Sequence, residues 1–311
     1  MSNRQPRFIN AGDGTRLRTQ TWDAAPGSPQ RGVCVLLSGQ TEFFEKYQEV
    51  IGELCGRGFA VAALDWRGQG GSARLLPNPL KAHIHNFSEY DDDLKSFMEQ
   101  IVKPLIAQTA PGKAPIALAH SMGGHILMRG LHDRPKDFAA AVFSAPMLRT
   151  QSRGYPGFLV RAIAFVQNAR GAKDDWVWGM SKRDPRTMKF SDQLVTSDPA
   201  RFARTQKLIV ANPDLRLSGP TWGWLEAAFS SMAQTFAPGY AEAITTPILI
   251  VGAGKDRIVD TRGAREFIAR VPHGEYVELA DAEHEILMEN DSIRARFWAA
   301  FDSFVARYTA A

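Results

Sequence analysis

The stretch Ile116-Ala-Leu-Ala-His-Ser-Met-Gly-Gly-His125 decides how this chain folds. Its first half is a short apolar run, typical of a buried parallel strand, and the residues after Ser121 have the spacing of a helix. Small residues stand two positions before and two positions after the serine, at Ala119 and Gly123. A sharp strand-to-helix turn needs small residues there, because bulky side chains would collide with the adjoining strand and helix. The stretch therefore predicts a turn with Ser121 at its apex.

Such a turn gives the serine a chemical role. It pushes the hydroxyl of Ser121 out of the sheet and places the N–H of Met122 at a helix N-terminus, where it can stabilise an anion. This pattern is a nucleophile elbow with Ala119 in place of the usual first glycine. An ordinary helix that begins at a serine N-cap followed by two glycines would have the same sequence. The rest of the chain has to decide between the two interpretations.

Apolar runs recur along the chain with helical patterns between them. This alternation predicts an α/β fold with a doubly wound, mostly parallel sheet covered on both faces. A hairpin at the N-terminus and a closing amphipathic helix from Ser292 to about Tyr308 complete the expected core. The predicted core strands are Gly32–Leu37, Phe59–Leu64, Ile116–Ala119, Phe138–Ser144, Pro247–Val251 and Tyr276–Leu279.

The alternation stops between Met147 and about Ala237. This span is helix-like, interrupted by prolines, and holds four of the seven tryptophans. We expect it to form a helical cap inserted between two parts of one core. The expected organisation is therefore residues 1–146 for the first part of the core, 147–237 for the cap and 238–311 for the second part.

Composition and charge limit the class of protein. Of the 311 residues, 44% are hydrophobic and 23% are charged, as is usual for a soluble globular protein. The polar N-terminus predicts no secretory signal, and no apolar stretch is long enough to cross a bilayer. Cys34 and Cys55 fall in a predicted strand and helix, where they are better core fillers than disulfide partners. We expect a cytoplasmic location, with peripheral contact at the inner membrane face left open.

A serine hydroxyl is a poor nucleophile without a base, which a carboxylate usually orients. His284 lies in a polar loop after the last predicted strand, and Asp256 follows the strand that ends at Val251. The order Ser121, Asp256, His284 is the one expected for this triad on a doubly wound sheet. Asp260 is the rival carboxylate, although it is well placed to cap the helix that follows.

Other histidines have weaker claims. His120 and His125 stand too close to Ser121 in sequence to be assumed partners. His83 and His85 have the spacing of a metal-binding pair, but no third ligand is evident. The sequence therefore predicts no metal site, and the chemistry of a serine, histidine and aspartate needs no organic cofactor.

The motifs together resemble an α/β-hydrolase of the lysophospholipase and monoacylglycerol lipase group. The resemblance runs nearly end to end, and two cap segments are more similar to the bacterial lysophospholipase branch than to the monoglyceride lipases. The core motifs are Ser38-Gly-Gln-Thr-Glu42 with Lys46-Tyr47, Asp65-Trp-Arg-Gly-Gln-Gly-Gly-Ser72, His120-Ser-Met-Gly-Gly124, Asp256-Arg-Ile-Val-Asp260 and His284-Glu-Ile-Leu-Met-Glu289. The cap segments are Leu194-Val-Thr-Ser-Asp198 and Gly219-Pro-Thr-Trp-Gly-Trp224.

The resemblance implies Ser121 as nucleophile, Asp256 as acid and His284 as base. It also implies that the N–H groups of Gln40 and Met122 form the oxyanion hole. Two departures affect detail rather than catalytic side chains. Ser38 stands where many relatives have a histidine before the glycine, and Ala119 replaces glycine in the elbow.

The cap should determine the substrate. Its tryptophans are candidates for an acyl-chain lining, although each of them also fits a purely structural role in holding the cap to the core. Between Leu148 and Phe236 there are 13 Lys and Arg against 7 Asp and Glu, a local balance of +6 within a total of +4. That excess fits a phosphate headgroup or an anionic membrane surface, and equally a solvated face. The tryptophans in question are Trp176, Trp178, Trp222 and Trp224.

The expected activity is hydrolysis of a lipid carboxylic ester through an acyl-enzyme, with a lysophospholipid as the first choice of substrate. A monoacylglycerol lipase, a general carboxylesterase, an aminopeptidase and a non-catalytic binding protein remain alternatives. An aminopeptidase would need cap carboxylates to hold a substrate ammonium, and the cap is poor in acids. No nucleic-acid motif or basic helix accompanies the positive charge, so nucleic acid is not an expected partner. The oligomeric state is left open.

Overall fold

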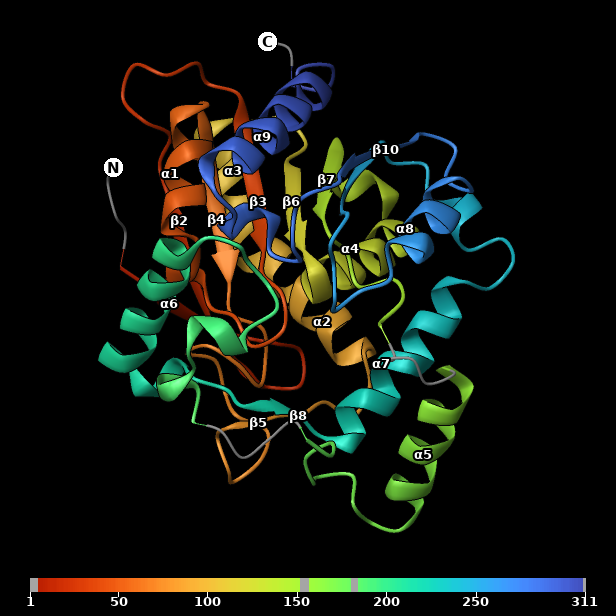
Figure 1. Ribbon diagram of the computed structural model, residues 1–311. Coiled ribbons are helices and arrows are strands. Elements are labelled where there is room, and N and C mark those ends of the chain that lie inside the picture. The colour runs from red at the N-terminus through yellow and green to blue at the C-terminus, as the bar shows by residue number, and fades with distance from the viewer. Residues whose placement is uncertain (1–4, 152–156, 180–183, 310–311) are drawn as a thin grey trace.

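A computed structural model describes residues 5–151, 157–179 and 184–309 (Figure 1). Its centre is an eight-stranded sheet in the order β1-β2-β4-β3-β6-β7-β9-β10, and the two short strands β5 and β8 pair separately. The pairs β1–β2 and β2–β4 are antiparallel and the other pairs of the large sheet are parallel. The strands are β1 (Arg7–Asn10), β2 (Arg16–Trp22), β3 (Gly32–Leu37), β4 (Phe59–Leu64), β5 (Lys81–Ala82), β6 (Ile116–His120), β7 (Ala140–Ser144), β8 (Gly219–Pro220), β9 (Ile248–Ala253) and β10 (Gly274–Leu279).

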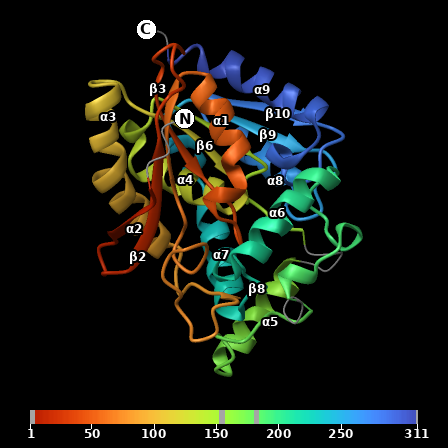
Figure 2. The same cartoon turned by 90° about the vertical axis from the view of Figure 1, so that its left-hand side faces the viewer.

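Helices cover both faces of the sheet. Figure 2 shows α2 and α3 on one side of the strands and α1 and α9 on the other. The strands β3, β4, β6 and β7 are buried along their whole length, as expected for a parallel sheet with two covered faces. The helices are α1 (Gln48–Gly56), α2 (Ser88–Phe97), α3 (Lys103–Thr109), α4 (Ser121–Asp133), α5 (Gly157–Ala169), α6 (Pro199–Ala211), α7 (Trp222–Thr235), α8 (Thr261–Ile268) and α9 (Asp291–Val305).

The predicted fold class is confirmed: the chain forms a mostly parallel, doubly wound sheet of the α/β-hydrolase type. One helical stretch is not continuous: α2 is followed by a π-helical segment, Met98–Val102, and then by α3.

The segment between β7 and β9 carries α5, α6 and α7, which lie below the sheet in Figure 1. Its strand β8 pairs in parallel with β5, which comes between β4 and α2 in the sequence. The side chain of Lys81 in β5 also donates a hydrogen bond to the carbonyl of Asp174 at 2.6 Å. These contacts attach the segment to the first half of the chain.

Backbone strain gathers where the parallel strands end. Thr41, Ser121 and Ala145 are the three non-glycine residues with positive φ in the described chain, at 62°, 49° and 45°. They follow β3, β6 and β7, which are neighbours in the sheet. Such conformations cost about 1–3 kcal/mol each and persist only where surrounding contacts enforce them. The strained backbone therefore marks one edge of the sheet.

The turn at Ser121 depends on close approach between α4 and β3. A Cβ atom added at Gly123 would lie 2.4 Å from the carbonyl oxygen of Ser38 and 2.7 Å from that of Leu37. Both obstacles are backbone atoms, which cannot swing aside. The sequence requirement for a small residue at this position thus has a direct steric cause.

We expect Gly123→Ala to destabilise the protein by about 2 kcal/mol or more, since overpacking a rigid site typically costs ~1–3 kcal/mol. Gly130→Ala in the same helix is the control, because its new methyl would meet the ends of two side chains, those of Leu94 and Arg134, and no backbone of another element. Urea unfolding of both variants measures the difference. Equal free energies of unfolding for the two variants would contradict the steric explanation.

Candidate functional site

Three predicted residues meet at the carboxyl edge of the sheet. Ser121 is the first residue of α4, Asp256 follows β9, and His284 follows β10. The Nε2 atom of His284 lies 3.0 Å from Ser121 Oγ, and its Nδ1 atom lies 2.7 Å from Asp256 Oδ2. The contact with Asp256 favours the tautomer in which Nδ1 carries the proton, so that Nε2 is free to accept the serine proton. All three side chains are less than 10% exposed.

The two candidate carboxylates have different surroundings. The second oxygen of Asp256, Oδ1, accepts hydrogen bonds from the N–H groups of Ile258 and Val259, both at 2.8 Å. Asp260 instead accepts from the N–H of Arg262 at the start of α8 and forms an ion pair with the Arg262 guanidinium at 2.9 Å. The geometry thus brings Asp256, and not Asp260, to the imidazole.

The two histidines nearest to Ser121 in sequence have other hydrogen-bond partners, although the His120 ring packs against that of His284 with the centroids 4.8 Å apart. The His120 Nδ1–H donates to the carbonyl of Ser144 at 3.0 Å, and His125 Nε2 lies 2.7 Å from Ser231 Oγ. Burial lowers the pKa of His120 to about 4 and that of His125 to about 3. Both imidazoles are therefore neutral near pH 7.

The loop after β3 carries Gln40, the predicted first oxyanion donor. Its backbone is held on both sides: Trp66 Nε1 donates to the carbonyl of Ser38, and Gln69 bonds the Gly39 carbonyl and the Thr41 N–H. A Cβ atom at Gly39 would lie 3.1 Å from the Ser121 Cβ. The loop therefore lies directly against the serine, and a glycine is needed for that approach. Met122, the second predicted oxyanion donor, is buried in the first turn of α4.

Sequence reasoning missed a buried charged cluster behind this loop. Lys46 Nζ lies 2.7 Å from Glu42 Oε1 and 2.6 Å from Glu285 Oε1. The Tyr47 hydroxyl donates to Glu42 Oε2 at 2.6 Å. Glu42, Lys46, Tyr47 and Glu285 all belong to the motifs that carry the family resemblance, and Glu285 is the neighbour of His284. Membership of these motifs and the adjacency of Glu285 to His284 were the sequence signals that could have pointed to the cluster.

The His83 and His85 pair is engaged within the protein. His83 Nδ1 lies 2.8 Å from Thr221 Oγ1, and His83 Nε2 lies 3.4 Å from His85 Nδ1. Across the described residues, no group of three or more His, Cys, Asp or Glu side chains is placed to hold a metal ion. No helix in the described ranges is long and apolar enough to cross a membrane.

The four cap tryptophans occupy different environments. Trp222 and Trp224 are buried, and Trp224 packs edge-on against Phe87 with the ring centroids 5.9 Å apart. Trp178 is 68% exposed and packs edge-on against Trp222. Trp176 lies beneath the ammonium group of Lys81. A role for these rings in substrate binding stays a prediction.

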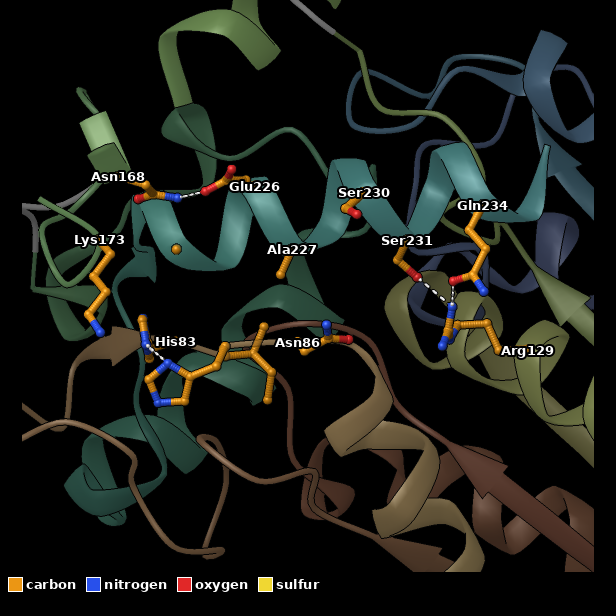
Figure 3. A pocket seen from close by; sticks show the side chains of 13 residues that line it. His83, Asn86, Arg129, Asn168, Lys173, Glu226, Ala227, Ser230, Ser231 and Gln234 are labelled. Atoms are coloured by element: carbon orange, nitrogen blue, oxygen red, sulfur yellow. Dashed lines mark hydrogen bonds between the residues drawn. The ribbon is translucent and has the colours of Figure 1, made fainter. Parts of the chain in front are cut away.

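Two cavities border the cap. One of about 350 Å³ lies beside α7, and Figure 3 shows Arg129 and Lys173 at its opposite ends with His83 and Asn86 between them. The other, of about 750 Å³, lies between α7 and the residues that follow β7 and β9. Its lining combines guanidinium and apolar side chains: Arg149, Arg161, Arg262, Phe229, Met232 and Phe236. The linings of both cavities consist of residues other than the triad.

Comparison with known proteins identifies the family. The chain is 32% identical to lysophospholipase L2 of Escherichia coli over 284 residues, which cover 89% of this chain and 81% of that protein. It is 26% identical to a monoacylglycerol lipase of Mycolicibacterium smegmatis, over 83% of this chain and 81% of that protein. A solved monoglyceride lipase of Saccharomyces cerevisiae superposes with a TM-score of 0.79 at 18% identity, covering 100% of this chain and 97% of that one, and so shares the fold. The family model described as serine aminopeptidase, S33, matches residues 28–291, and the chain belongs to that family of α/β-hydrolases.

Proposed function

We propose that this protein is a serine hydrolase that releases the fatty acid from lysophospholipids. The observation that carries the proposal is the chain of contacts from Asp256 through His284 to the Ser121 hydroxyl. The relative from Escherichia coli, 32% identical, is named lysophospholipase L2, and two relatives at 26% identity are named a probable lysophospholipase L2 and a monoacylglycerol lipase. Both names denote hydrolysis of a lipid carboxylic ester.

The mechanism follows from the geometry. His284 Nε2 takes the proton as Ser121 Oγ attacks the ester carbonyl, and the carboxylate of Asp256 stabilises the resulting imidazolium. The N–H groups of Gln40 and Met122 receive the negative charge that develops on the carbonyl oxygen. His284 then protonates the leaving alcohol, and a water molecule activated by the same imidazole releases the fatty acid. The alcohol carries the headgroup away.

The 750 Å³ cavity supports an amphipathic, anionic substrate. Phe229 and Met232 on α7 and Phe236 just after it offer apolar area, and the guanidinium group of Arg161 is on the same lining. Arg149 is there too, in an ion pair with Glu266 that a phosphate would have to share. A lysophospholipid has an acyl chain and a phosphate, which match these two kinds of side chain. In this proposal the cap tryptophans add apolar area along the acyl chain.

Neutral esters and peptides are the competing substrates. A monoacylglycerol lipase or a general carboxylesterase would use the same triad without needing the cationic lining. The family description names an aminopeptidase. The described part of the larger cavity has only Asp260 and Glu266 as carboxylates, and each forms an ion pair with an arginine, which disfavours a substrate ammonium there.

We expect Asp256→Asn to lower kcat by about 10⁴-fold, because the amide favours the wrong tautomer of His284. Asp260→Asn is the matched control: asparagine caps helices as well as aspartate does, so kcat should stay within about threefold. Steady-state hydrolysis of a p-nitrophenyl ester compares them. Retained activity in the first variant with loss in the second would overturn the assignment of the acid.

A substrate panel tests the headgroup. With Ser121→Ala as the blank, lysophosphatidylcholine and lysophosphatidylethanolamine should be hydrolysed with a higher kcat/KM than a monoacylglycerol of the same chain length. Arg149→Gln should narrow that preference, because a lost contact to a charged group is worth about 1.5–3 kcal/mol. Equal or faster turnover of the neutral ester by the wild type would instead assign the activity to a monoacylglycerol lipase or general esterase.

We further propose peripheral contact with an anionic membrane surface from a cytoplasmic location. In and after α5, Phe165 is 63% exposed and Trp178 68% exposed, and Arg161, Arg170 and Lys173 are exposed nearby in sequence. Exposed aromatic side chains with basic neighbours are typical of surfaces that rest on anionic lipid.

The double variant Phe165→Ala/Trp178→Ala should bind phosphatidylglycerol vesicles at least tenfold more weakly, since each buried ring contributes about 1.5–3 kcal/mol. Val210→Ala on α6 removes an equally exposed apolar side chain (56%) and should have little effect. Vesicle co-sedimentation measures both. Unchanged binding of the double variant would place the contact elsewhere or remove it.

A further inference from the structure

The charged cluster behind the site links two catalytic loops. At one end, Glu42 Oε2 accepts a hydrogen bond from the N–H of Gly39, the residue before Gln40. At the other end, Glu285 directly follows His284. Lys46 lies between the two carboxylates and contacts both, at 2.7 and 2.6 Å. Glu42 and Lys46 belong to the segment that follows β3, and Glu285 to the segment that follows β10.

The stability of the fold alone does not explain why these charged side chains are buried. The side chains of Glu42 and Lys46 are 5% and 7% exposed, and that of Glu285 is 14% exposed. Removing three charges from water costs several kcal/mol for each ion, and a well-packed apolar set of similar volume is often as stable or more stable. We therefore ask whether the cluster fixes the positions of the loops that it joins.

The pKa directions indicate a charged Glu42–Lys46 pair, whereas burial raises the pKa of Glu285 above its usual value. Burial alone would raise the pKa of Glu42, but Lys46 and the hydrogen bonds outweigh it and lower that pKa to about 2. Burial opposes the charge of Lys46, yet Glu285 and Glu42 hold its pKa above the usual value. Glu42 is thus a carboxylate and Lys46 an ammonium near pH 7.

The oxyanion loop needs such an anchor. Thr41 has a φ of 62°, a strained conformation for a β-branched residue, so the loop would relax if its contacts were removed. The Gly39 N–H donates to the carboxylate of Glu42, which fixes the Ser38–Gly39 peptide, one peptide before the one that carries the Gln40 N–H. This carboxylate cannot turn, because it also accepts hydrogen bonds from Lys46 and Tyr47. A hydrogen-bonded charge resists displacement more than a neutral acceptor does.

We infer that Glu42, Lys46 and Glu285 act as positioning residues, which fix the Gln40 N–H relative to the Ser121–His284 pair. The ion chain spans the two loops whose relative placement decides whether the oxyanion meets its donor. The inference rests on the catalytic roles proposed above for Ser121 and His284. A misplacement of about 1 Å far from the reacting atoms can cost about 10²-fold in rate.

The test compares four variants with the wild type. Lys46→Met breaks the chain in its middle, Glu285→Gln removes one charge but keeps the shape, and Lys46→Arg restores a cation that can reach both carboxylates. Glu45→Gln is the control, because Glu45 lies in the same turn but pairs with Arg18. Thermal unfolding identifies any variant that has lost its fold, and Glu285→Gln, which retains a hydrogen-bond acceptor for Lys46, guards against that loss.

Two inhibitors separate positioning from general damage. A trifluoromethyl ketone with an acyl chain forms a tetrahedral oxyanion on the serine, whereas an ether analogue of a lysophospholipid has no carbonyl and senses only ground-state binding. Lys46→Met should lower kcat about 10- to 100-fold with KM within about twofold, and weaken the ketone by a similar factor without changing the ether analogue. Lys46→Arg should recover most of the loss, and Glu285→Gln should show a smaller loss of the same kind.

Three results would overturn the inference: unchanged kcat in Lys46→Met, equal loss of affinity for both inhibitors, or no recovery in Lys46→Arg. The rate at which a fluorophosphonate labels Ser121 keeps this test separate from the choice of substrate. If the wild type is labelled but cleaves no ester better than Ser121→Ala, the proposed substrate is wrong, and the labelling rates of the variants still decide the inference. If the wild type is not labelled, the serine hydrolase function fails, and the inference fails with it.

Discussion

The close approach of α4 to the end of β3 is the constraint on which the site depends. The missing side chain at Gly123 lets the helix meet the carbonyls of Leu37 and Ser38, and Ser121, at the turn into this helix, has a positive φ. The same contact brings the loop that carries Gln40 against the serine. The proposed nucleophile and the proposed oxyanion donor are therefore placed by one backbone contact.

The other two proposed catalytic groups, Asp256 and His284, rely on sheet topology. In the order β3-β6-β7-β9-β10, the parallel strands all end at the same edge, so residues that are far apart in sequence meet there. The His284 imidazole reaches across from β10 to the end of β6, and Asp256, from the intervening β9, orients it. Local strain at Ser121 and long-range strand order thus contribute separately to one geometry.

The sequence predicted most of this arrangement because its signals are local and steric. Apolar runs, small residues around Ser121 and polar loops after strands each have one simple structural cause. The preference for Asp256 over Asp260 also followed from capping, since a carboxylate just before a helix satisfies its free N–H groups.

What the sequence could not predict depends on contacts between distant segments. The ion pair between Lys46 and Glu285 joins residues 239 positions apart, and nothing in the sequence around either residue predicts that its charged side chain is buried. The cap cavities likewise depend on how α7 packs against residues that follow β7 and β9. For Trp178 and Trp224, composition alone gave one expectation, whereas packing makes one exposed and the other buried.

Part of the predicted cap is hydrogen-bonded to the segment that follows His284. Val195 accepts a hydrogen bond from the Glu285 N–H at 2.7 Å, and the Thr196 hydroxyl donates to the Met288 carbonyl, so this part of the cap is bonded to the very loop that holds the base. Arg201 in α6 extends the attachment through ion pairs to Glu49 and Asp291. These contacts tie residues 195–201 to the loop that carries His284. The placement of His284 therefore depends on residues inserted between β7 and β9 as well as on its own strand, so that a change in this insertion would reach the proposed base without touching it.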